Sequence, residues 1–411
     1  MFRADLLEDK RALPIAFRFV GMAASLAANI IVAKQLDLEQ IAYYFLYVTL
    51  SYFGNAALFV GMSIALQRCF STLATSRQLN KTLLVQYLTV SLAIGVIVVA
   101  IVAVMYLSGR SAGRNVWSVA VCCATLSGAT YLSAAAKDLL ALGNRLSIAA
   151  LFSFLEQVLR LIFIVLVLIV GHKNAIEVTA AVAAGSALSG IAAIATLLFS
   201  FERAPSSATD AISFGRIVHT VGPIGFSGIL NWLQLQSYRP ILLYFGTRPE
   251  LVGIAALLTS LGMAGANPVL AVTAQRFIPS LYAGEATAFR ACMLALARLA
   301  LVLAACSIPA AFAFLFLSGR RTLVLYLLLV PIGVFVEAGN NVIGAIVHRQ
   351  NSVGGSMWRF AAAGAIGVLV MGLFWFAPVR NEMIPYCIGV GMIASQIAVV
   401  ATVAAISKVR C

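Results

Sequence analysis

The stretch FLEQVLRLIFIVLVL, residues 154–168, shows what kind of chain this is. Two charged side chains, Glu156 and Arg160, stand among residues that are otherwise almost all aliphatic or aromatic. The apolar run continues on both sides and covers residues 146–170. A helix needs about 20 apolar residues to cross the roughly 30 Å hydrocarbon core of a bilayer. This stretch therefore predicts a membrane-spanning helix.

Similar runs recur along the whole chain. Hydrophobic residues make up 62% of the 411 positions and charged residues only 10%, whereas a soluble domain is about 25% charged. Because such a chain cannot cover its own surface with polar groups, we predict an all-α polytopic membrane protein of 12 transmembrane helices. The predicted spans are 13–33, 41–66, 82–108, 115–141, 146–170, 176–200, 213–246, 251–280, 289–317, 322–347, 357–378 and 383–407.

The gap with the most soluble character, FERAPSSATDAI at 201–212, divides these spans into six and six. We predict an N-terminal six-helix bundle over 1–200, a cytoplasmic linker over 201–212 and a C-terminal six-helix bundle over 213–411. QRCFSTL at 67–73 and QRFIPSL at 275–281 close the second and eighth spans. An echo six spans apart indicates a parallel repeat, with pseudo-symmetric bundles.

The basic residues predict the orientation of the spans. The net charge is +14, but no basic stretch is interleaved with aromatic residues as a nucleic-acid surface requires. Counted over alternate gaps, one side has sixteen Lys and Arg residues and the other eight. The richer side includes both ends of the chain, so we predict that both termini are cytoplasmic and that the N-terminal MFRADLLEDKRALP is a retained tail.

Cysteine and histidine show no binding pattern. The seven cysteines are odd in number and lack a C-x-x-C pair, and the three histidines lie far apart. Neither a disulfide framework nor a metal site is indicated. We expect no cofactor.

Charged residues inside the spans are the strongest candidates for function. A charge at the centre of a span costs at least about 2.5 kcal/mol, so such residues tend to face a bundle interior or a water-filled cavity. Two of the arginines lie near span ends, where they can instead extend to the interface. The candidates are Arg18, Arg160, Arg239 and Arg298, with the acidic Glu156 and Glu337.

Glu156 and Arg160 are four residues apart, on one helix face. They form either a neutralised structural pair or part of an ion-coupling site, and Glu337 is the second coupling candidate. Uncharged polar residues repeat at helical spacing in several spans and predict the lining of a hydrated cleft between the bundles. These residues are Ser25, Asn29, Asn55, Ser227, Asn231, Gln234, Asn340 and Asn341.

Three stretches resemble a known family. FRFVGMAASLAANIIVAKQLDLEQIAYYFLYVTL (17–50), FLEQVLRLIFIVLVL (154–168) and LQLQSYRPILLYFGTRPELVGIAAL (233–257) are similar to segments of polysaccharide transporters. These are the lipid-linked oligosaccharide (O-antigen, Wzx-type) flippases of the multidrug/oligosaccharidyl-lipid/polysaccharide exporter superfamily. Two departures concern Tyr238, where the family often has Asp, and the turn at Asp37, Leu38 and Ala42, which lacks the usual glycines.

The resemblance implies an exporter-like V-shaped cleft and alternating access in the bacterial inner membrane. The implied cargo is an undecaprenyl-pyrophosphate-linked oligosaccharide, flipped to the periplasmic leaflet for surface or exopolysaccharide synthesis and coupled to an H⁺ or Na⁺ gradient. The four arginines would bind the pyrophosphate or acidic sugars, since guanidinium groups contact phosphate bidentately. Membrane lipids, and the polymerase and chain-length proteins of the same pathway, would be partners.

Three alternatives remain open. A multidrug or metabolite antiporter of the same fold would favour acidic residues in the cleft, but here four arginines stand against two glutamates. A membrane glycan polymerase or ligase needs sizeable loops for its catalytic groups, and the predicted gaps are short, so we expect no enzyme. A scaffold without transport activity would leave the polar stripes without a role.

Overall fold

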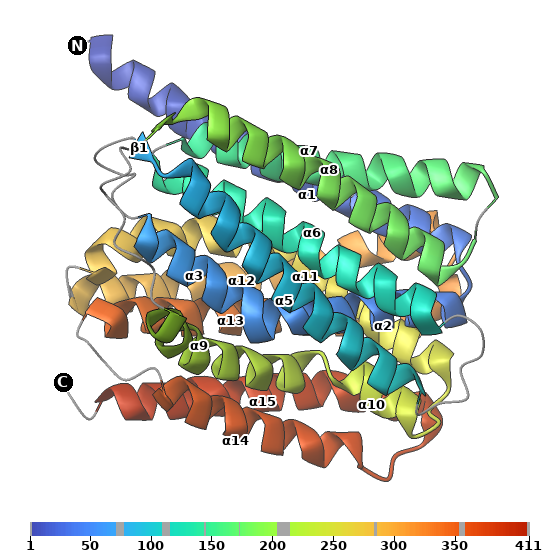
Figure 1. The fold of residues 1–411 in the computed structure, drawn as a ribbon. Coiled ribbons are helices and arrows are strands. Elements are labelled where there is room, and N and C mark those ends of the chain that lie inside the picture. Colours follow the sequence, from blue (N-terminus) through green and yellow to red (C-terminus); the bar gives the residue numbers. More distant parts are fainter. Residues whose placement is uncertain are drawn as a thin grey trace. The chain divides into compact units, whose positions relative to one another are not determined.

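The computed structural model describes residues 2–70, 78–108, 116–143, 145–171, 173–203, 214–282, 286–352 and 358–408. These residues are almost entirely helical (Figure 1). In the described ranges the strands are β1 (Gln78–Leu79) and β2 (Glu202–Arg203), two residues each. The predicted all-α polytopic fold is confirmed.

Every predicted apolar run coincides with one helix or with consecutive helical segments. Ten of the described helices are long and apolar enough to cross a membrane, and the apolar part of α14, Phe360–Trp375, is shorter. The helices are α1 (Phe2–Gln35), α2 (Leu38–Gly54), the π-helix η1 (Asn55–Phe59), α3 (Val60–Cys69), α5 (Lys81–Ser108), α6 (Val116–Leu142), α7 (Leu146–Ile169), α8 (Ala175–Ser200), α9 (Phe214–Leu235), α10 (Tyr238–Tyr244), α11 (Pro249–Tyr282), α12 (Ala286–Leu317), the 3₁₀ helix η3 (Arg321–Tyr326), α13 (Leu329–Ser352), α14 (Trp358–Trp375), the 3₁₀ helix η4 (Asn381–Met383) and α15 (Ile384–Lys408).

The helices group into two compact units by their contacts. The first unit comprises residues 1–28 and 46–229, and the second comprises 29–45 and 230–411. Helices α1, α2 and α9 each contribute one part to each unit. Residues 204–213, most of the predicted linker, lie outside the described residues, as do residues 71–73 of the first heptapeptide echo. The predicted division into 1–200 and 213–411 stays a prediction.

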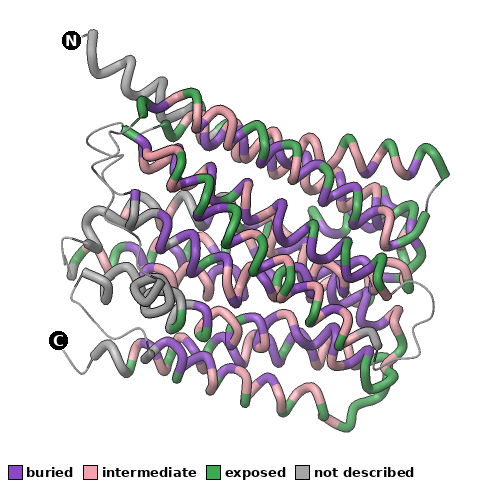
Figure 2. The backbone as a smooth tube through the Cα atoms, in the orientation of Figure 1, coloured by how far each residue is buried: buried purple, intermediate pink, exposed green. Residues whose placement is uncertain are grey.

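Helix α6 forms the centre of the first unit and packs against α5, α7 and α8. Figure 2 shows buried residues on the inner sides of these helices and exposed ones on their outer sides. Glycine brings α7 and α8 close, because a Cβ at Gly185 would lie 2.7 Å from the backbone nitrogen of Arg160. The rings of Phe59 and Tyr131 stack with centroids 4.2 Å apart. This packing sets the distances in the polar cluster described below.

The two short strands pair with each other and bring together two segments that connect helices of this unit. β1 follows α3 and pairs in parallel with β2, which follows α8. The two inter-helix segments therefore lie together, at the same end of the unit. Four predicted spans, an even number, separate them along the chain, which agrees with the alternation of sides predicted from sequence.

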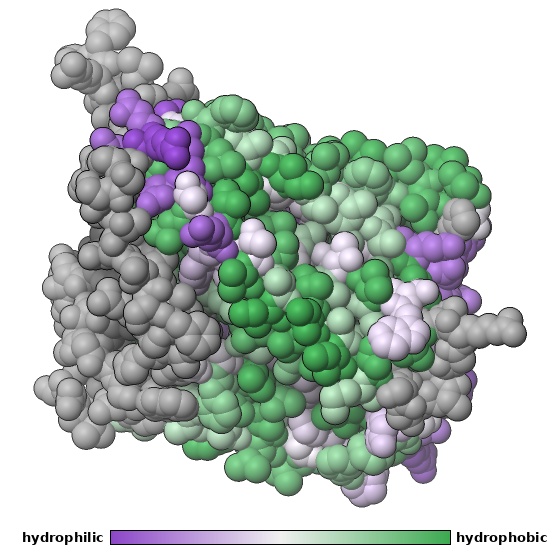
Figure 3. Space-filling model, in the orientation of Figure 1, coloured by the Kyte–Doolittle hydropathy of each residue, from purple (hydrophilic) through white to green (hydrophobic). Residues whose placement is uncertain are grey.

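In the second unit α11 and α13 make the closest helix crossing. A Cβ at Gly262 would lie 1.9 Å from the Val330 carbonyl oxygen, and one at Gly333 would lie 2.1 Å from that of Thr259. Small residues let backbones approach in membrane helices, where van der Waals packing drives association. Helix α12 covers one side of this pair, and α15 packs against α13 and α14. Figure 3 shows hydrophobic side chains over much of the drawn face.

Candidate functional site

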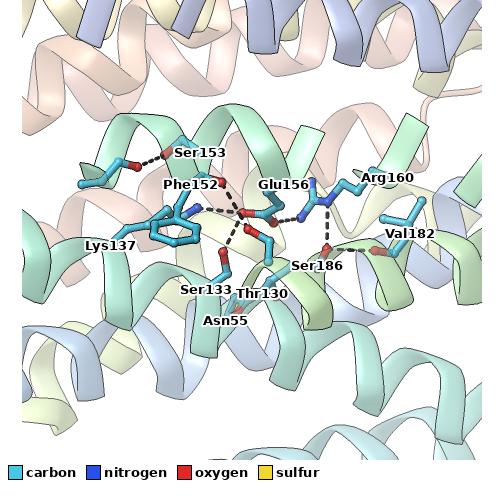
Figure 4. Close-up of polar contacts among 12 residues, drawn as sticks. Asn55, Thr130, Ser133, Lys137, Phe152, Ser153, Glu156, Arg160, Val182 and Ser186 are labelled. Atoms are coloured by element: carbon cyan, nitrogen blue, oxygen red, sulfur yellow. Dashed lines mark hydrogen bonds and ion pairs between the residues drawn. The ribbon is translucent and has the colours of Figure 1, made fainter. Parts of the chain in front are cut away.

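The first unit holds a buried ionic cluster around Glu156 (Figure 4). Glu156 is only 4% exposed. One of its carboxylate oxygens, Oε2, accepts hydrogen bonds from Lys137 Nζ and Ser133 Oγ, both at 2.7 Å. The other oxygen, Oε1, accepts from Arg160 Nη2, so the predicted pair of Glu156 and Arg160 forms. The carboxylate thus has two cationic partners.

The cluster joins three helices. Ser133 and Lys137 lie four residues apart on α6, Glu156 and Arg160 four apart on α7, and Arg160 Nε donates to Ser186 Oγ on α8 at 2.8 Å. Two cations and one anion give the cluster a formal charge of +1. This arrangement is typical of an ion-pair network that stabilises the fold, since both carboxylate oxygens accept hydrogen bonds from neighbouring side chains.

The second unit holds a different kind of carboxylate site. Glu337 on α13 is 7% exposed. Its Oε1 accepts hydrogen bonds from Asn267 Nδ2 on α11 at 2.8 Å and from Asn341 Nδ2 at 3.3 Å. Both donors are neutral carboxamides. A buried carboxylate among such partners is suited to take up a proton or a monovalent cation, because no fixed cation has to be displaced from these two bonds.

A chain of carboxamides lies next to Glu337. Gln234 Nε2 on α9 donates to Gln396 Oε1 on α15 at 2.8 Å and to Ser395 Oγ at 3.2 Å. Gln396 Nε2 donates in turn to Asn340 Oδ1 on α13, the residue after Gly339, at 2.9 Å. A Cβ at Gly339 would lie 2.4 Å from Gln396 Cγ, so glycine makes room for this side chain. Helices α9, α13 and α15 are thereby connected by buried amides.

Arg239 is buried inside the second unit at the start of α10. It is 4% exposed, and its guanidinium carbon lies 5.3 Å from the ring centroid of Phe45 and 5.2 Å from that of Tyr238. The guanidinium also donates to Gln236 Oε1 at 2.6 Å and to Ser260 Oγ at 3.3 Å. Tyr238, which stands where the flippases often have Asp, offers Arg239 an aromatic ring and a hydroxyl group.

The four predicted basic residues divide evenly between the two units. Arg18 and Arg160 belong to the first unit, and Arg239 and Arg298 to the second. Arg18 is half-buried on α1. Arg298 is exposed on α12, whereas Arg239 is buried. Arg239 and Arg298 therefore have different surroundings within one unit.

The predicted polar lining is also distributed. Ser25 and Ser227 are half-buried in the first unit, and Asn55 Nδ2 in the π-helix donates to Thr130 Oγ1 at 2.9 Å. Asn29 is half-buried and Asn231 exposed in the second unit. Of the predicted lining, the members that join a described network in the second unit are Gln234, Asn340 and Asn341.

Several members of these clusters were not predicted from sequence. Ser133, Lys137 and Ser186 complete the ionic cluster, and Asn267 and Gln396 complete the carboxamide network. The sequence pattern could have indicated two of them, Lys137 and Gln396. Lys137 stands four residues after Ser133, next to Asp138 near the end of an apolar run, and Gln396 is the one carboxamide within 383–407.

Within the described residues, no group of three or more His, Cys, Asp and Glu side chains is arranged to hold a metal ion.

Comparison with solved structures identifies the fold. An inward-facing multidrug resistance MATE family transporter of the MOP superfamily matches with a TM-score of 0.59 and 14% identity, over 97% of this chain and 99% of that one. The chain has the MATE transporter fold. The outward-facing form of a multidrug resistance MATE family transporter matches with a TM-score of 0.60 and 13% identity, over 96% of this chain and 94% of that one.

A third match is a MOP superfamily transporter from Pyrococcus furiosus, with a TM-score of 0.56, 14% identity, and coverage of 97% of this chain and 96% of that one. Its description reports a binding pocket of reverse polarity that suggests a different function. No protein-family model matches this chain. No curated protein sequence matches it either.

Proposed function

We propose that this chain is a cation-coupled antiporter that exports small organic molecules by alternating access. The proposal is supported by the fold, which it shares with multidrug resistance transporters described in inward-facing and outward-facing forms. A carrier of this kind needs a group whose occupancy by an ion changes between the two sides of the membrane.

The observation that carries the proposal is the contrast between the two buried carboxylates. Glu156 is bound by Lys137 and Arg160, and losing either bond would leave an uncompensated buried charge. Glu337 instead accepts hydrogen bonds from Asn267 and Asn341, which are neutral. Ionisable residues inside membrane segments mark ion and proton pathways. We therefore assign ion coupling to Glu337 and a structural role to Glu156.

The experiment is dye efflux from cells that lack their own drug exporters. Cells expressing the protein should extrude a fluorescent cation such as ethidium, and collapse of the ion gradient should stop the extrusion. Glu337→Gln should lower the initial rate at least tenfold at equal protein level, since a carboxamide cannot bind a proton or Na⁺ by charge. Glu382→Gln, an exposed glutamate of η4, is the matched control. Equal rates for Glu337→Gln and the control would exclude Glu337 as the coupling residue.

A second candidate function is the flipping of a lipid-linked oligosaccharide. The observation that favours it is the charge balance, because the Glu156 cluster carries a net positive charge and Arg18 and Arg239 add further cations. Such a surplus suits a pyrophosphate or acidic glycan better than a cationic drug. Polymerase and chain-length proteins would then be partners, and the coupling ion would be H⁺ or Na⁺.

A deletion strain separates the two functions. A flippase predicts loss of surface polymer and accumulation of the lipid-linked repeat unit inside the cell, with unchanged drug sensitivity. The antiporter predicts normal polymer with increased sensitivity to exported compounds. We place the protein in the bacterial inner membrane with both termini in the cytoplasm, as the excess of Lys and Arg on one side indicates. A reporter fused to the C-terminus should be active only in the cytoplasm, and periplasmic activity would contradict this topology.

A further inference from the structure

Helix α12 presents a long exposed face that is apolar except for two arginines. It packs on one side against α11 and α13. On the opposite side the large residues are exposed, among them Leu294 at 52%, Leu301 at 62% and Val302 at 57%. Of its most apolar 18-residue stretch, only 28% is buried. A face this apolar is stable against lipid chains and not against water.

Arg290 and Arg298 stand on this same face. Both are exposed, and their positions relative to Leu294 follow a spacing of four residues, which keeps side chains on one side of a helix. The two Cα atoms are separated by eight residues, or roughly 12 Å along the axis. Neither arginine forms a hydrogen bond or ion pair with another residue that the structure describes.

The length of α12 sets the depth of Arg298. The helix ends at Leu317, and Arg320 and Arg321 follow directly after Gly319. Arg298 precedes Leu317 by about 19 residues, or roughly 29 Å of helix, which is close to the roughly 30 Å thickness of the hydrocarbon core. With Arg320 and Arg321 at one membrane boundary, Arg298 reaches the other boundary, and Arg290 lies beyond it in the headgroup layer.

We propose that the exposed start of α12 binds the phosphate headgroup of an anionic phospholipid. Arg298 and Arg290 contact the phosphate, since guanidinium groups bind phosphate bidentately. The acyl chains lie along Leu301 and Val302. By the predicted orientation this end of α12 is cytoplasmic, where anionic lipids create a negative surface potential. Arg298 is thus a lipid-binding residue and not part of the transport cleft.

Native mass spectrometry of the full-length protein in detergent tests the proposal. Phosphatidylglycerol is added stepwise in one series and phosphatidylcholine in the other, and the lipids retained are counted. The wild type should retain phosphatidylglycerol preferentially. Each neutralised arginine should weaken that binding about fivefold, as expected for a basic residue at an anionic membrane surface. Arg290→Gln and Arg298→Gln together should weaken it about 25-fold, the product of the two single effects.

Two control variants make the result decisive. Arg298→Lys keeps the charge and should bind within about threefold of wild type, and Arg380→Gln removes an exposed arginine away from α12 and should change nothing. Equal retention of both lipids by the wild type, or an equal loss in Arg380→Gln, would overturn the proposal. It would also be overturned if a polyprenyl pyrophosphate bound through Arg298 while phosphatidylglycerol did not compete, because the face would then be a cargo site.

Discussion

Replacing Glu156 by glutamine tests whether the buried ionic cluster stabilises the fold. The substitution keeps the size of the side chain but leaves Lys137 and Arg160 without their shared carboxylate. Removing one partner of a buried ion pair costs about 3–5 kcal/mol. The side chains of Lys137 and Arg160 retain 19% and 18% exposure, so the lower end applies, at about 3 kcal/mol.

The expected shift can be measured by thermal unfolding of the purified protein in detergent. For a cooperative unit of about 200 residues, 3 kcal/mol corresponds to a decrease in Tm of roughly 6–12 °C. Lys137→Met combined with Glu156→Gln should recover at least half of that decrease, because one of the two uncompensated cations is removed. Glu382→Gln serves as the exposed control and should leave Tm unchanged. If Glu156→Gln folded with wild-type Tm and lost only transport, the structural interpretation would be refuted and Glu156 would be an ion-coupling residue.

Three further changes follow from the same structure. Gly228→Ala should lower stability by about 1–3 kcal/mol, because its Cβ would lie 2.0 Å from the Ala56 carbonyl oxygen; Gly222→Ala, where nothing lies within 4 Å, should be neutral in the same unfolding assay. Gln396→Leu should lower Tm and the efflux rate together, since it leaves Gln234 and Asn340 without their shared buried partner, and an unchanged Tm would argue against the network. Arg320→Met should destabilise the protein by about 1–3 kcal/mol, because it removes the hydrogen bonds to the carbonyl oxygens of Ala33, in the last turn of α1, and Leu36, just after it. Unaltered protease sensitivity at the end of α1 would contradict this.

The fold was predictable because membrane-spanning helices appear in the sequence as continuous apolar runs. Each of the predicted ranges coincides with helix, and the positions of Gly262 and Gly333 became informative once the structure showed a backbone crossing at both. The breaks within helices were harder. Nothing in the run 41–66 distinguishes a π-helix at Asn55–Phe59 from an ordinary α-helical turn, since the extra residue is accommodated by packing against α9.

The candidate site was predictable only where its members share a helix. Glu156 and Arg160 are four residues apart, so their pairing follows from helix geometry alone. Ser186 and Lys137 come from other helices, and their contribution depends on how α6, α7 and α8 pack. For Arg298, the sequence predicts the helix but not the side of the helix on which the residue lies. The sequence places it inside an apolar run, but which side of α12 it occupies is decided by the contacts with α11 and α13.

The most direct test of ion coupling at Glu337 is substrate-induced ion release from proteoliposomes. The purified protein is reconstituted with a pH-sensitive or Na⁺-sensitive dye in the lumen, and a transported cation is added outside without an imposed gradient. The account predicts that the wild type and Glu382→Gln move H⁺ or Na⁺ out of the lumen when the cation enters, and that Glu337→Gln does not, although it elutes as a folded protein. Ion movement of wild-type size in Glu337→Gln would contradict the account.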